Sequence, residues 1–390
     1  MNQLFLDAKQ ASRTLLAYSD EQLSAALRAV ADAIEQHIPS LLEANALDVQ
    51  AMDAADPLRD RLLLTPGRLK DIAHDMRHVA GLPTPLGILS EQRTLSNGLR
   101  LRRVSVPFGV IGVIYEARPN VTFDVFSLCL KSGNACLLKG SRSAEHSNRA
   151  AVALIHEVLQ TLGFNPAVCT LLPATHEATG MLLDAVGLVD LVIPRGGRKL
   201  IDFVRQNAHV PVIETGAGVV HAYFDADGDL EKGRRILANA KMRRPSVCNS
   251  LDCVLVHRSR EKDIPELLSP MKGKVEVVEG DYGTEWMALK MGVRVVDSLN
   301  EALEHIAKYG SGHSECIITE NASAAHRFQQ MADAACVYWN APTSFTDGAQ
   351  FGLGAEIGIS TQKLGPRGPM GLREITTYKW LIDGDGQVRA

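Results

Sequence analysis

The spacing of hydrophobic positions changes twice along the chain. In the first region, apolar residues recur every three to four positions, as on one face of a helix. Leu23, Leu27 and Ile34 follow a possible capping box at Ser19 and Gln22. A further cap followed by proline stands at Thr65-Pro66. These patterns predict amphipathic helices in the amino-terminal region.

Between Leu86 and Val106 the spacing becomes that of short strands. Residues 94–101 place Asn97-Gly98 between two strand-like segments, and an Asn-Gly pair favours a tight hairpin turn. We therefore expect a β-hairpin here. The tail from Arg373 to Ala390 predicts strands on both sides of a turn at residues 383–386.

From Val110 to His221, continuous apolar segments alternate with helical patterns. The expected strands are 110–115, 135–139, 168–172, 188–193 and 210–213, and the expected helices are 143–162 and 197–207. These segments lack the alternation of apolar and polar residues that is typical of a sheet with one exposed face. They predict a mainly parallel sheet covered on both faces, with ligands at the carboxyl ends of the strands.

A second alternating block extends from about residue 229 to residue 340. The expected strands are 251–257, 277–278, 293–296, 316–319 and 336–339, and the expected helices are 230–241, 299–309 and 323–332. The chain is thus predicted to form two α/β domains. It contains no internal repeat and no low-complexity stretch that would indicate a solenoid or a disordered tail.

Composition limits the class of protein. A chain of 390 residues exceeds one typical core, and a net charge of -4 gives no general attraction to nucleic acid or to an anionic membrane. The amino terminus lacks the pattern of a secretory signal, and no apolar run approaches the roughly 18 residues of a membrane span. Seven cysteines without a Cys-x-x-Cys pair fit a reducing compartment. We expect a cytoplasmic protein that binds neither nucleic acid nor membrane.

Several common motifs are missing from the sequence. There is no P-loop, and residues 216–221 have His221 where a dinucleotide fingerprint needs a third small residue. No His-Glu-x-x-His helix occurs, and no histidines group with cysteine at zinc-like spacing. The sequence therefore predicts no metal site.

Two basic, glycine-containing segments follow predicted strands. Arg195-Gly196-Gly197 precedes a helix, so its backbone N–H groups could face a pyrophosphate, although an ordinary strand-to-helix turn explains it equally well. Lys139-Gly140-Ser141 has the same two interpretations, a cofactor-ribose contact or a solvated loop.

Cys248 has the setting of a nucleophile. It lies in a polar segment between a predicted helix and a predicted strand, and two arginines precede it by four and five positions. Nearby positive charge favours the reactive thiolate. The alternative is a small buried apolar residue, which is the common fate of cysteine. That second role is expected for the six cysteines in or beside apolar runs, namely Cys129, Cys136, Cys169, Cys253, Cys316 and Cys336.

Five long motifs occur in one order along the chain. They are residues 116–122 (EARPNVT), 130–135 (LKSGNA), 193–197 (IPRGG), 244–249 (RPSVCN) and 352–356 (GLGAE). Together they closely resemble the gamma-glutamyl phosphate reductase family, also called glutamate-5-semialdehyde dehydrogenases, of the aldehyde dehydrogenase superfamily. The resemblance covers nearly the whole chain and ends in residues 361–364 and 367–372.

The resemblance implies an aldehyde dehydrogenase-like architecture. Residues 1–85 and 108–224 would form an NADP-binding domain, and residues 225–358 a catalytic domain. Residues 86–107 and 359–390 would form a small β-hairpin oligomerisation flap. Because such a flap exposes strand edges, a homodimer or homotetramer is expected.

The resemblance also implies a reaction, the NADPH-dependent reduction of L-glutamate 5-phosphate to L-glutamate 5-semialdehyde with release of phosphate. This is the second step of proline biosynthesis from glutamate. Cys248 matches the nucleophile that forms a thioester, and Asn120 matches the side-chain donor to the oxyanion. A loop asparagine that caps a helix is the alternative for Asn120. Glutamate 5-kinase is a plausible functional partner, because an acyl phosphate is labile.

Family motifs assign the cofactor contacts. Lys139, with Gly140 and Ser141 beside it, would contact the adenosine ribose and the 2′-phosphate of NADPH. Gly196 and Gly197 would approach the pyrophosphate, and Glu285 would hold the nicotinamide ribose.

The substrate contacts are less specific. Arg118 and Arg195 are candidates for binding substrate anions, or for structural ion pairs. Glu214 matches the general base of hydrolytic relatives, which the forward reaction does not need, so it either lines the site or is a helix-approach carboxylate.

Three departures from the family pattern affect these expectations. Ser344 stands where an arginine is usual, next to Phe345 at the expected substrate mouth; Val219-Val220 replaces Asn-Cys; and the region 265–281 is short. They leave room for an aldehyde dehydrogenase or acyl-phosphate reductase of another specificity, or for a non-catalytic scaffold. Oxidation of the semialdehyde with and without phosphate distinguishes the first alternative, and cofactor binding distinguishes the second.

Overall fold

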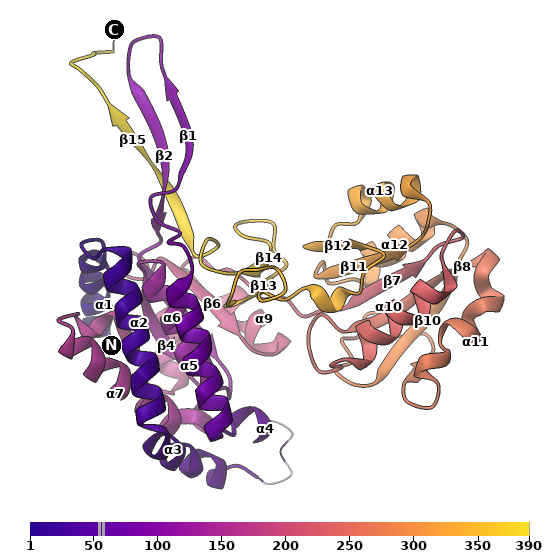
Figure 1. The fold of residues 1–390 in the computed structure, drawn as a ribbon, viewed down its shortest axis with the longest axis horizontal. Helices are drawn as coiled ribbons and strands as arrows, with labels where there is room; N and C mark the ends of the chain where they lie inside the picture. The colour runs from indigo at the N-terminus through magenta and orange to yellow at the C-terminus, as the bar shows by residue number, and fades with distance from the viewer. Residues whose placement is uncertain (54–55, 57–58, 390) are drawn as a thin grey trace. The chain divides into compact units, whose positions relative to one another are not determined.

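The computed structural model describes residues 1–53, 56 and 59–389 (Figure 1). The chain forms two compact units. The first contains Met1–Glu214, Leu353–Gly358 and Met370–Ala390, and the second contains Thr215–Gly352 and Ile359–Pro369. The first division falls ten residues earlier than the expected boundary at 224, because the strand Val220–Phe224 pairs within the second unit. Residues 359–369 likewise belong to the second unit rather than to the flap.

Helices build the amino-terminal part of the first unit. They are α1 (Asn2–Leu15), α2 (Asp20–Gln36), α3 (Ile38–Ala51), α4 (Arg59–Leu62) and α5 (Pro66–Gly81). Both predicted caps are confirmed. The Ser19 side chain accepts from the backbone N–H of Gln22, whose side chain accepts from Ser19, and Thr65 Oγ1 accepts from the N–H of Arg68.

The first sheet is parallel, with strands in the order β5 (Cys169–Leu171), β4 (Ala135–Lys139), β3 (Val110–Tyr115) and β6 (Leu191–Arg195). Its strands are connected or followed by α6 (Asn120–Lys131), α7 (Glu145–Thr161), α8 (His176–Leu183) and α9 (Arg198–Asn207). Every residue of β3 is buried, as expected for a central strand covered on both faces.

Two expected strands of this sheet differ in the structure. The strand expected from 188 begins at Leu191, because Leu188 and Val189 donate to the carbonyl of Ala185 in a turn. Residues 210–213 contribute only an isolated bridge between Val192 and Val212. Pro211 has no N–H to extend that pairing into a ladder.

An antiparallel three-stranded sheet projects from the helices of the first unit (Figure 1). Its order is β1 (Leu89–Thr94), β2 (Arg100–Pro107) and β15 (Thr376–Asp383), so the predicted hairpin is confirmed. The tail supplies one strand rather than two, since the described residues after Asp383 form none.

The second unit contains a six-stranded parallel sheet. Its order is β12 (Cys336–Trp339), β11 (Ser314–Ile318), β7 (Val220–Phe224), β8 (Leu251–His257), β10 (Lys290–Val296) and β9 (Glu276–Val278). The helices are α10 (Leu230–Met242), α11 (Ile264–Leu267), α12 (Leu299–Tyr309) and α13 (Ala322–Met331). The short strands β13 (Gly358–Ser360) and β14 (Gly368–Met370) form a separate two-stranded sheet.

The core of the second unit lies on both faces of its sheet. Alternate residues of β7 enter different apolar clusters, Phe224 with Leu237 and Tyr223 with Phe328. This strand was missing from the sequence prediction. The prediction of two α/β domains with mainly parallel sheets is confirmed. Among the described residues, no helix combines the length and the apolar character that crossing a bilayer requires.

Candidate active site

The predicted site residues of the first unit lie at the carboxyl edge of its sheet. Lys139 ends β4 and is followed by Gly140 and Ser141, while Arg195 ends β6 and is followed by Gly196 and Gly197. Arg118, which is exposed, and Asn120 follow the central strand β3. Because β4 and β6 flank β3 in parallel, these segments leave neighbouring strands at the same edge.

Asn120 is the first residue of α6 and does not cap it. The N-cap position belongs to Pro119, and the Asn120 side-chain Nδ2 donates to Asp124 Oδ2 at 2.9 Å. The helix-capping interpretation is therefore wrong. Burial raises the pKa of the Asp124 carboxyl to about 6, with the Asn120 hydrogen bond and the Arg195 charge acting in the opposite direction. An amide has two N–H donors, so this contact uses one of them.

A carboxylate occupies the glycine turn after β6. The backbone N–H of Gly197 donates to Glu116 Oε2 at 3.2 Å, and the N–H of Glu116 donates to the carbonyl of Arg195. The sequence did not indicate this contact, although Glu116 begins one of the five motifs. An anion bound at the Gly197 N–H would have to replace Glu116 there.

A cavity of about 210 Å³ opens beside the turn after β4. Gly140, Ser141 and Asn148 line it, together with residues of the segment after β5. Asn148 Nδ2 is buried and has no hydrogen-bond partner among the described residues, whereas its Oδ1 accepts from Thr122. A Cβ at Gly140 would lie 2.2 Å from that Nδ2, so a larger residue here would displace the Asn148 amide. The unsatisfied donor and the open volume fit a polar ligand such as a ribose or a base.

Glu214 is the last residue of the segment Met1–Glu214 of the first unit, and its side chain forms an ion pair. Its Oε1 accepts from Arg205 Nε at 2.7 Å, and Oε2 contacts the same guanidinium. The pair joins the residue to α9. This geometry favours the structural alternative for Glu214 over a carboxylate held ready to remove a proton.

Cys248 differs from the other six cysteines. It is half-buried, whereas all six of the others are buried, as the sequence predicted. It lies in the loop 243–250, which enters the amino end of β8. The backbone of Gly218 contacts this loop so closely that a Cβ at Gly218 would lie 1.5 Å from the carbonyl oxygen of Cys248.

Glu285 approaches the same place from a distant part of the sequence. Its Oε1 accepts from the backbone N–H of Gly218 at 3.0 Å. Gly218 precedes β7 and Glu285 precedes β10. Within the second unit, the predicted nucleophile and Glu285 thus meet at the amino edge of the sheet, with Gly218 between them.

The segment 343–346 borders the nucleophile loop. Asn249 Nδ2 donates to the carbonyl of Thr346 at 2.9 Å, and Thr343 Oγ1 donates to the carbonyl of Asn249 at 2.9 Å. Ser344 is 7% exposed and its hydroxyl donates to Asn239 Oδ1 at 2.7 Å. Phe345, in contrast, is 46% exposed. Within the second unit, the structure thus places the segment 343–346 beside Asn249, the neighbour of Cys248, and it engages the Ser344 hydroxyl with Asn239.

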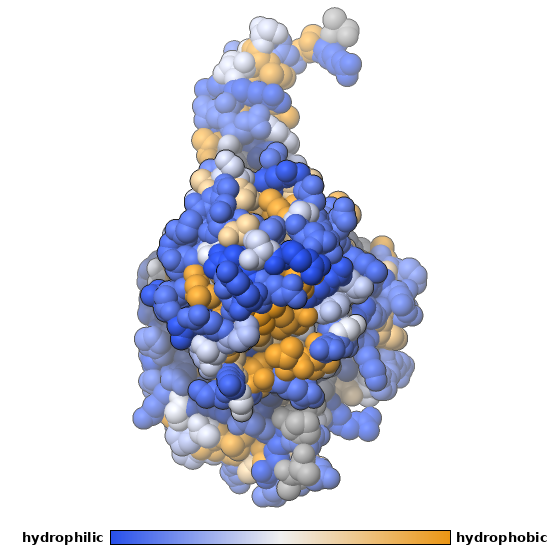
Figure 2. Space-filling model, turned by 90° about the vertical axis from the view of Figure 1, so that its right-hand side faces the viewer, coloured by the Kyte–Doolittle hydropathy of each residue, from blue (hydrophilic) through white to orange (hydrophobic). Residues whose placement is uncertain are grey.

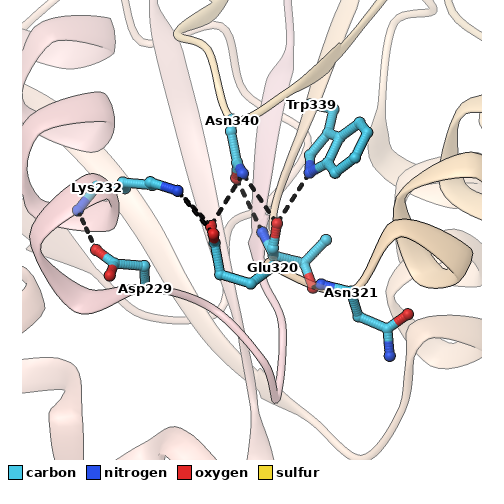
Figure 3. Close-up of polar contacts among 7 residues, drawn as sticks. Asp229, Lys232, Glu320, Asn321, Trp339 and Asn340 are labelled. Atoms are coloured by element: carbon cyan, nitrogen blue, oxygen red, sulfur yellow. Dashed lines mark hydrogen bonds and ion pairs between the residues drawn. The ribbon is translucent and has the colours of Figure 1, made fainter.

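Asn340 lies three residues before the segment 343–346, at the carboxyl end of β12. Figure 3 shows its side chain between the Glu320 carboxylate and the backbone of the preceding residue, Thr319. Nδ2 donates to the carbonyl of Thr319 and to Glu320 Oε1, and Oδ1 accepts from the N–H of Thr319. Lys232 Nζ, on α10, contacts the same Glu320 carboxylate at 2.7 Å. Asn340 has a φ of 52°, which asparagine tolerates better than most residues.

His221, Cys253 and His305 form a buried cluster within the described part of the second unit. Their nitrogen and sulfur atoms lie within 4.8 Å of one another. The sequence did not indicate it, because strand pairing and α12 bring distant residues together. Arg294 donates to His305 Nδ1 at 2.8 Å, and a guanidinium has no acceptor. His305 Nε2 therefore carries the proton, so His305 as it stands offers no lone pair to a metal ion.

The comparisons with known proteins agree with this geometry. Residues 1–286 match the model of the aldehyde dehydrogenase family, and the chain belongs to that family. The fold is aldehyde dehydrogenase-like, as predicted. An acetylating aldehyde dehydrogenase from Geobacillus thermoglucosidasius, 15% identical over 100% of this chain and 97% of its own, shares the fold with a TM-score of 0.72.

The more similar relatives carry one name. Gamma-glutamyl phosphate reductase of Chlorobium chlorochromatii is 56% identical, with 98% of this chain and 97% of the relative covered. The protein of that name from Bacteroides thetaiotaomicron is 54% identical over 100% and 99% of the two chains. The crystal structure of the Thermotoga maritima gamma-glutamyl phosphate reductase is 39% identical and has a TM-score of 0.96 over 100% of this chain and 99% of its own. The predicted family is confirmed, and it implies a nicotinamide cofactor.

Proposed function

We propose that this enzyme reduces L-glutamate 5-phosphate with NADPH to L-glutamate 5-semialdehyde and inorganic phosphate, the second step of proline biosynthesis. The observation that carries the proposal is the near-full-length similarity to gamma-glutamyl phosphate reductases, at 52–56% identity. The half-buried Cys248 at the centre of one motif supports it.

Cys248 acts as the nucleophile. Its thiolate attacks the acyl carbon, the bond from that carbon to the phosphate oxygen breaks, and phosphate leaves a thioester on Sγ. The nicotinamide supplies the hydride that reduces the thioester carbon. The carbon–sulfur bond of the resulting hemithioacetal anion then breaks, which releases the aldehyde and restores the thiolate.

Asn120 stabilises the negative oxygen that forms in both addition steps. One N–H of its amide is held by Asp124, and the other is the proposed donor to the oxyanion. The backbone N–H of Cys248 is the second proposed donor. Loss of one such donor typically costs about 2.7 to 4 kcal/mol of barrier stabilisation.

The cofactor is proposed to lie along the carboxyl edge of the first sheet. Gly140 and Ser141 line the cavity in which Asn148 Nδ2 lacks a partner among the described residues, which suits the adenosine end. Lys139 would contact the ribose and the 2′-phosphate that distinguishes NADPH. Gly196 and Gly197 would meet the pyrophosphate in place of Glu116. For the nicotinamide ribose the proposed partner is Glu285.

Charge and position support proposals for the substrate contacts. Arg118 and Arg195 would bind its anionic groups, since both follow or end strands at the same edge as Asn120. Phe345 would line the substrate mouth through its exposed ring. Ser344 and Glu214 would line the site. Their side chains would keep their present partners, which are Asn239 for Ser344 and Arg205 for Glu214.

The projecting sheet of the first unit supports assembly into a homodimer or homotetramer. Tyr378, Trp380 and Ile382 alternate along β15 and are exposed at 56%, 36% and 59%. Figure 2 shows apolar side chains among polar ones on this projection. Such a stripe beside a strand edge favours cover by another subunit. A cytoplasmic location and functional coupling to glutamate 5-kinase complete the proposal.

Single-turnover reduction of glutamate 5-phosphate tests reaction, nucleophile and cofactor together. The native protein should produce semialdehyde and phosphate in equal amounts, faster with NADPH than with NADH, and Cys248→Ser should produce neither. Equal rates with Cys248→Ser would refute the nucleophile. Semialdehyde oxidation that proceeds without phosphate would instead support a non-phosphorylating aldehyde dehydrogenase.

A further inference from the structure

A buried ion pair joins the two ends of the nucleophile loop. Lys241 lies in the last turn of α10, immediately before residues 243–250, and Asp252 is the second residue of β8, immediately after them. Lys241 Nζ and Asp252 Oδ1 are 3.5 Å apart, and the two side chains are 0% and 3% exposed. The pair therefore fixes where the helix that precedes Cys248 meets the strand that follows it.

Asp252 also connects to the surroundings of Cys248 on a second side. Its Oδ1 accepts from the backbone N–H of Trp286 at 3.2 Å. The neighbouring Glu285 accepts from the N–H of Gly218, whose backbone contacts the Cys248 carbonyl. The contacts thus form a closed path from Lys241 through Asp252 and the 285–286 segment to Gly218 and back to the loop.

Fold stability alone does not explain this pair. Burial lowers the pKa of Lys241 and raises that of Asp252 to about 6, so both charged forms are costly in the folded protein. Apolar side chains of similar volume often stabilise a fold as well as a buried ion pair, or better. An ion pair adds a defined distance and direction, which apolar packing specifies less well.

We propose that Lys241 and Asp252 are positioning residues, which hold Cys248 and the Gly218–Glu285 contact in reactive geometry. This rests on the proposed role of Cys248 as nucleophile. Neither residue is expected to touch the substrate, since both are buried beneath the loop. Their removal should therefore lower kcat and the intrinsic reactivity of Cys248, with little effect on KM.

The test compares Lys241→Met, Asp252→Asn and the double variant Lys241→Met/Asp252→Leu in the full chain. Each is assayed for kcat, KM, Tm and the rate of alkylation by iodoacetamide across a pH series. The other six cysteines are buried, so alkylation reports Cys248, and Cys248→Ser gives the background rate. The double variant leaves no unpaired buried charge but removes the acceptor of the Trp286 N–H, so its Tm should fall by only a few degrees.

In the double variant, kcat and the limiting alkylation rate at high pH should each fall about 100-fold, as expected for a displacement of the thiolate on the order of 1 Å. Asp252→Asn keeps the volume and an acceptor for Trp286. It leaves Lys241 beside a neutral partner, so its Tm should fall, and it should lower both rates about 10-fold. Lys131→Met is the control, because it breaks the ion pair of another buried lysine, here with the exposed Asp20. It should lower Tm without changing alkylation of the folded protein.

Native kcat and native alkylation in the double variant, or in Asp252→Asn if the double variant does not fold, would overturn the proposal. So would a shift of the pH midpoint of alkylation with an unchanged limiting rate, since that indicates a charge effect rather than positioning. Full activity of Cys248→Ser would refute the proposed function instead, and the two failures are therefore distinguishable.

Discussion

Replacement of Gly218 by alanine should disable the enzyme without unfolding it. The new Cβ would lie 1.5 Å from the Cys248 carbonyl oxygen, 2.5 Å from its carbonyl carbon and 2.9 Å from its Cα. All three are backbone atoms, so no side chain can rotate away. Either the nucleophile loop or the segment that carries Gly218 must move.

The size of the movement follows from these distances. Cβ atoms essentially never approach another heavy atom within 3.0 Å, so the two backbones must separate by at least about 1.5 Å. A 1 Å misplacement of a reacting group can cost about 100-fold in rate, which corresponds to roughly 2.7 kcal/mol of barrier. The strain itself should cost about 1–3 kcal/mol of stability, which a typical domain tolerates.

The assay is single-turnover reduction of glutamate 5-phosphate, with alkylation of Cys248 and Tm measured on the same samples. We expect kcat to fall at least about 100-fold, with Tm lower by only a few degrees. Gly180→Ala is the control, because a Cβ there meets nothing within 4 Å and the residue lies inside α8. It should leave kcat unchanged and stabilise the helix by about 1 kcal/mol.

Native turnover and native alkylation in Gly218→Ala would refute this reasoning. They would mean that the loop can move by more than 1 Å without loss of reactivity. The contact with Gly218 would then only fill space, and the path from Asp252 to Cys248 would lose its last step.

Three further predictions concern other parts of the two units. The pKa of Asp124 is about 6 in the folded protein, above its ordinary 3.8, so the protonated carboxyl is the form that the fold favours. The stability that this carboxyl contributes is complete below pH 3.8 and is lost as pH rises through 6. Asp124→Asn should therefore be more stable than the native protein at pH 8, by on the order of 2 kcal/mol, but not at pH 4, and an equal difference in unfolding free energy at both pH values in urea titration would contradict this. Asn340→Gly keeps the backbone freedom but removes three hydrogen bonds, so the free energy of unfolding should fall by about 2–3 kcal/mol in urea titration, and an unchanged midpoint would show that they contribute nothing. Ser344→Ala removes the donor to Asn239 and should cost about 1 kcal/mol of stability with KM for glutamate 5-phosphate unchanged within about threefold; a large rise in KM would instead place the hydroxyl on the substrate.

Local patterns predicted most of the architecture. The caps at Ser19 and Thr65, the Asn-Gly hairpin and the continuous apolar strands rest on interactions within a few residues, which the sequence displays directly. The strand β7 was missed because its start lies in the glycine-containing segment 216–221, which was compared with a dinucleotide fingerprint. Its place between β8 and β11 depends on tertiary pairing alone.

The candidate site was predictable as a set of residues but not as a set of contacts. Motifs indicated Cys248, Asn120 and the glycine turns. They did not indicate that Glu116 occupies the Gly197 N–H or that Ser344 donates to Asn239. These contacts join residues 81 and 105 positions apart, and no local spacing rule reports on them.

The location of Cys248 at the amino edge of its sheet has an electrostatic consequence. Its loop follows the carbonyl end of α10, which carries partial negative charge, and no described helix begins within residues 243–250. The loop that carries Cys248 therefore supplies no helix amino terminus of its own, the usual backbone source of thiolate stabilisation. To the extent that the arginines of this loop stabilise the thiolate, added salt should lower the reactivity of Cys248.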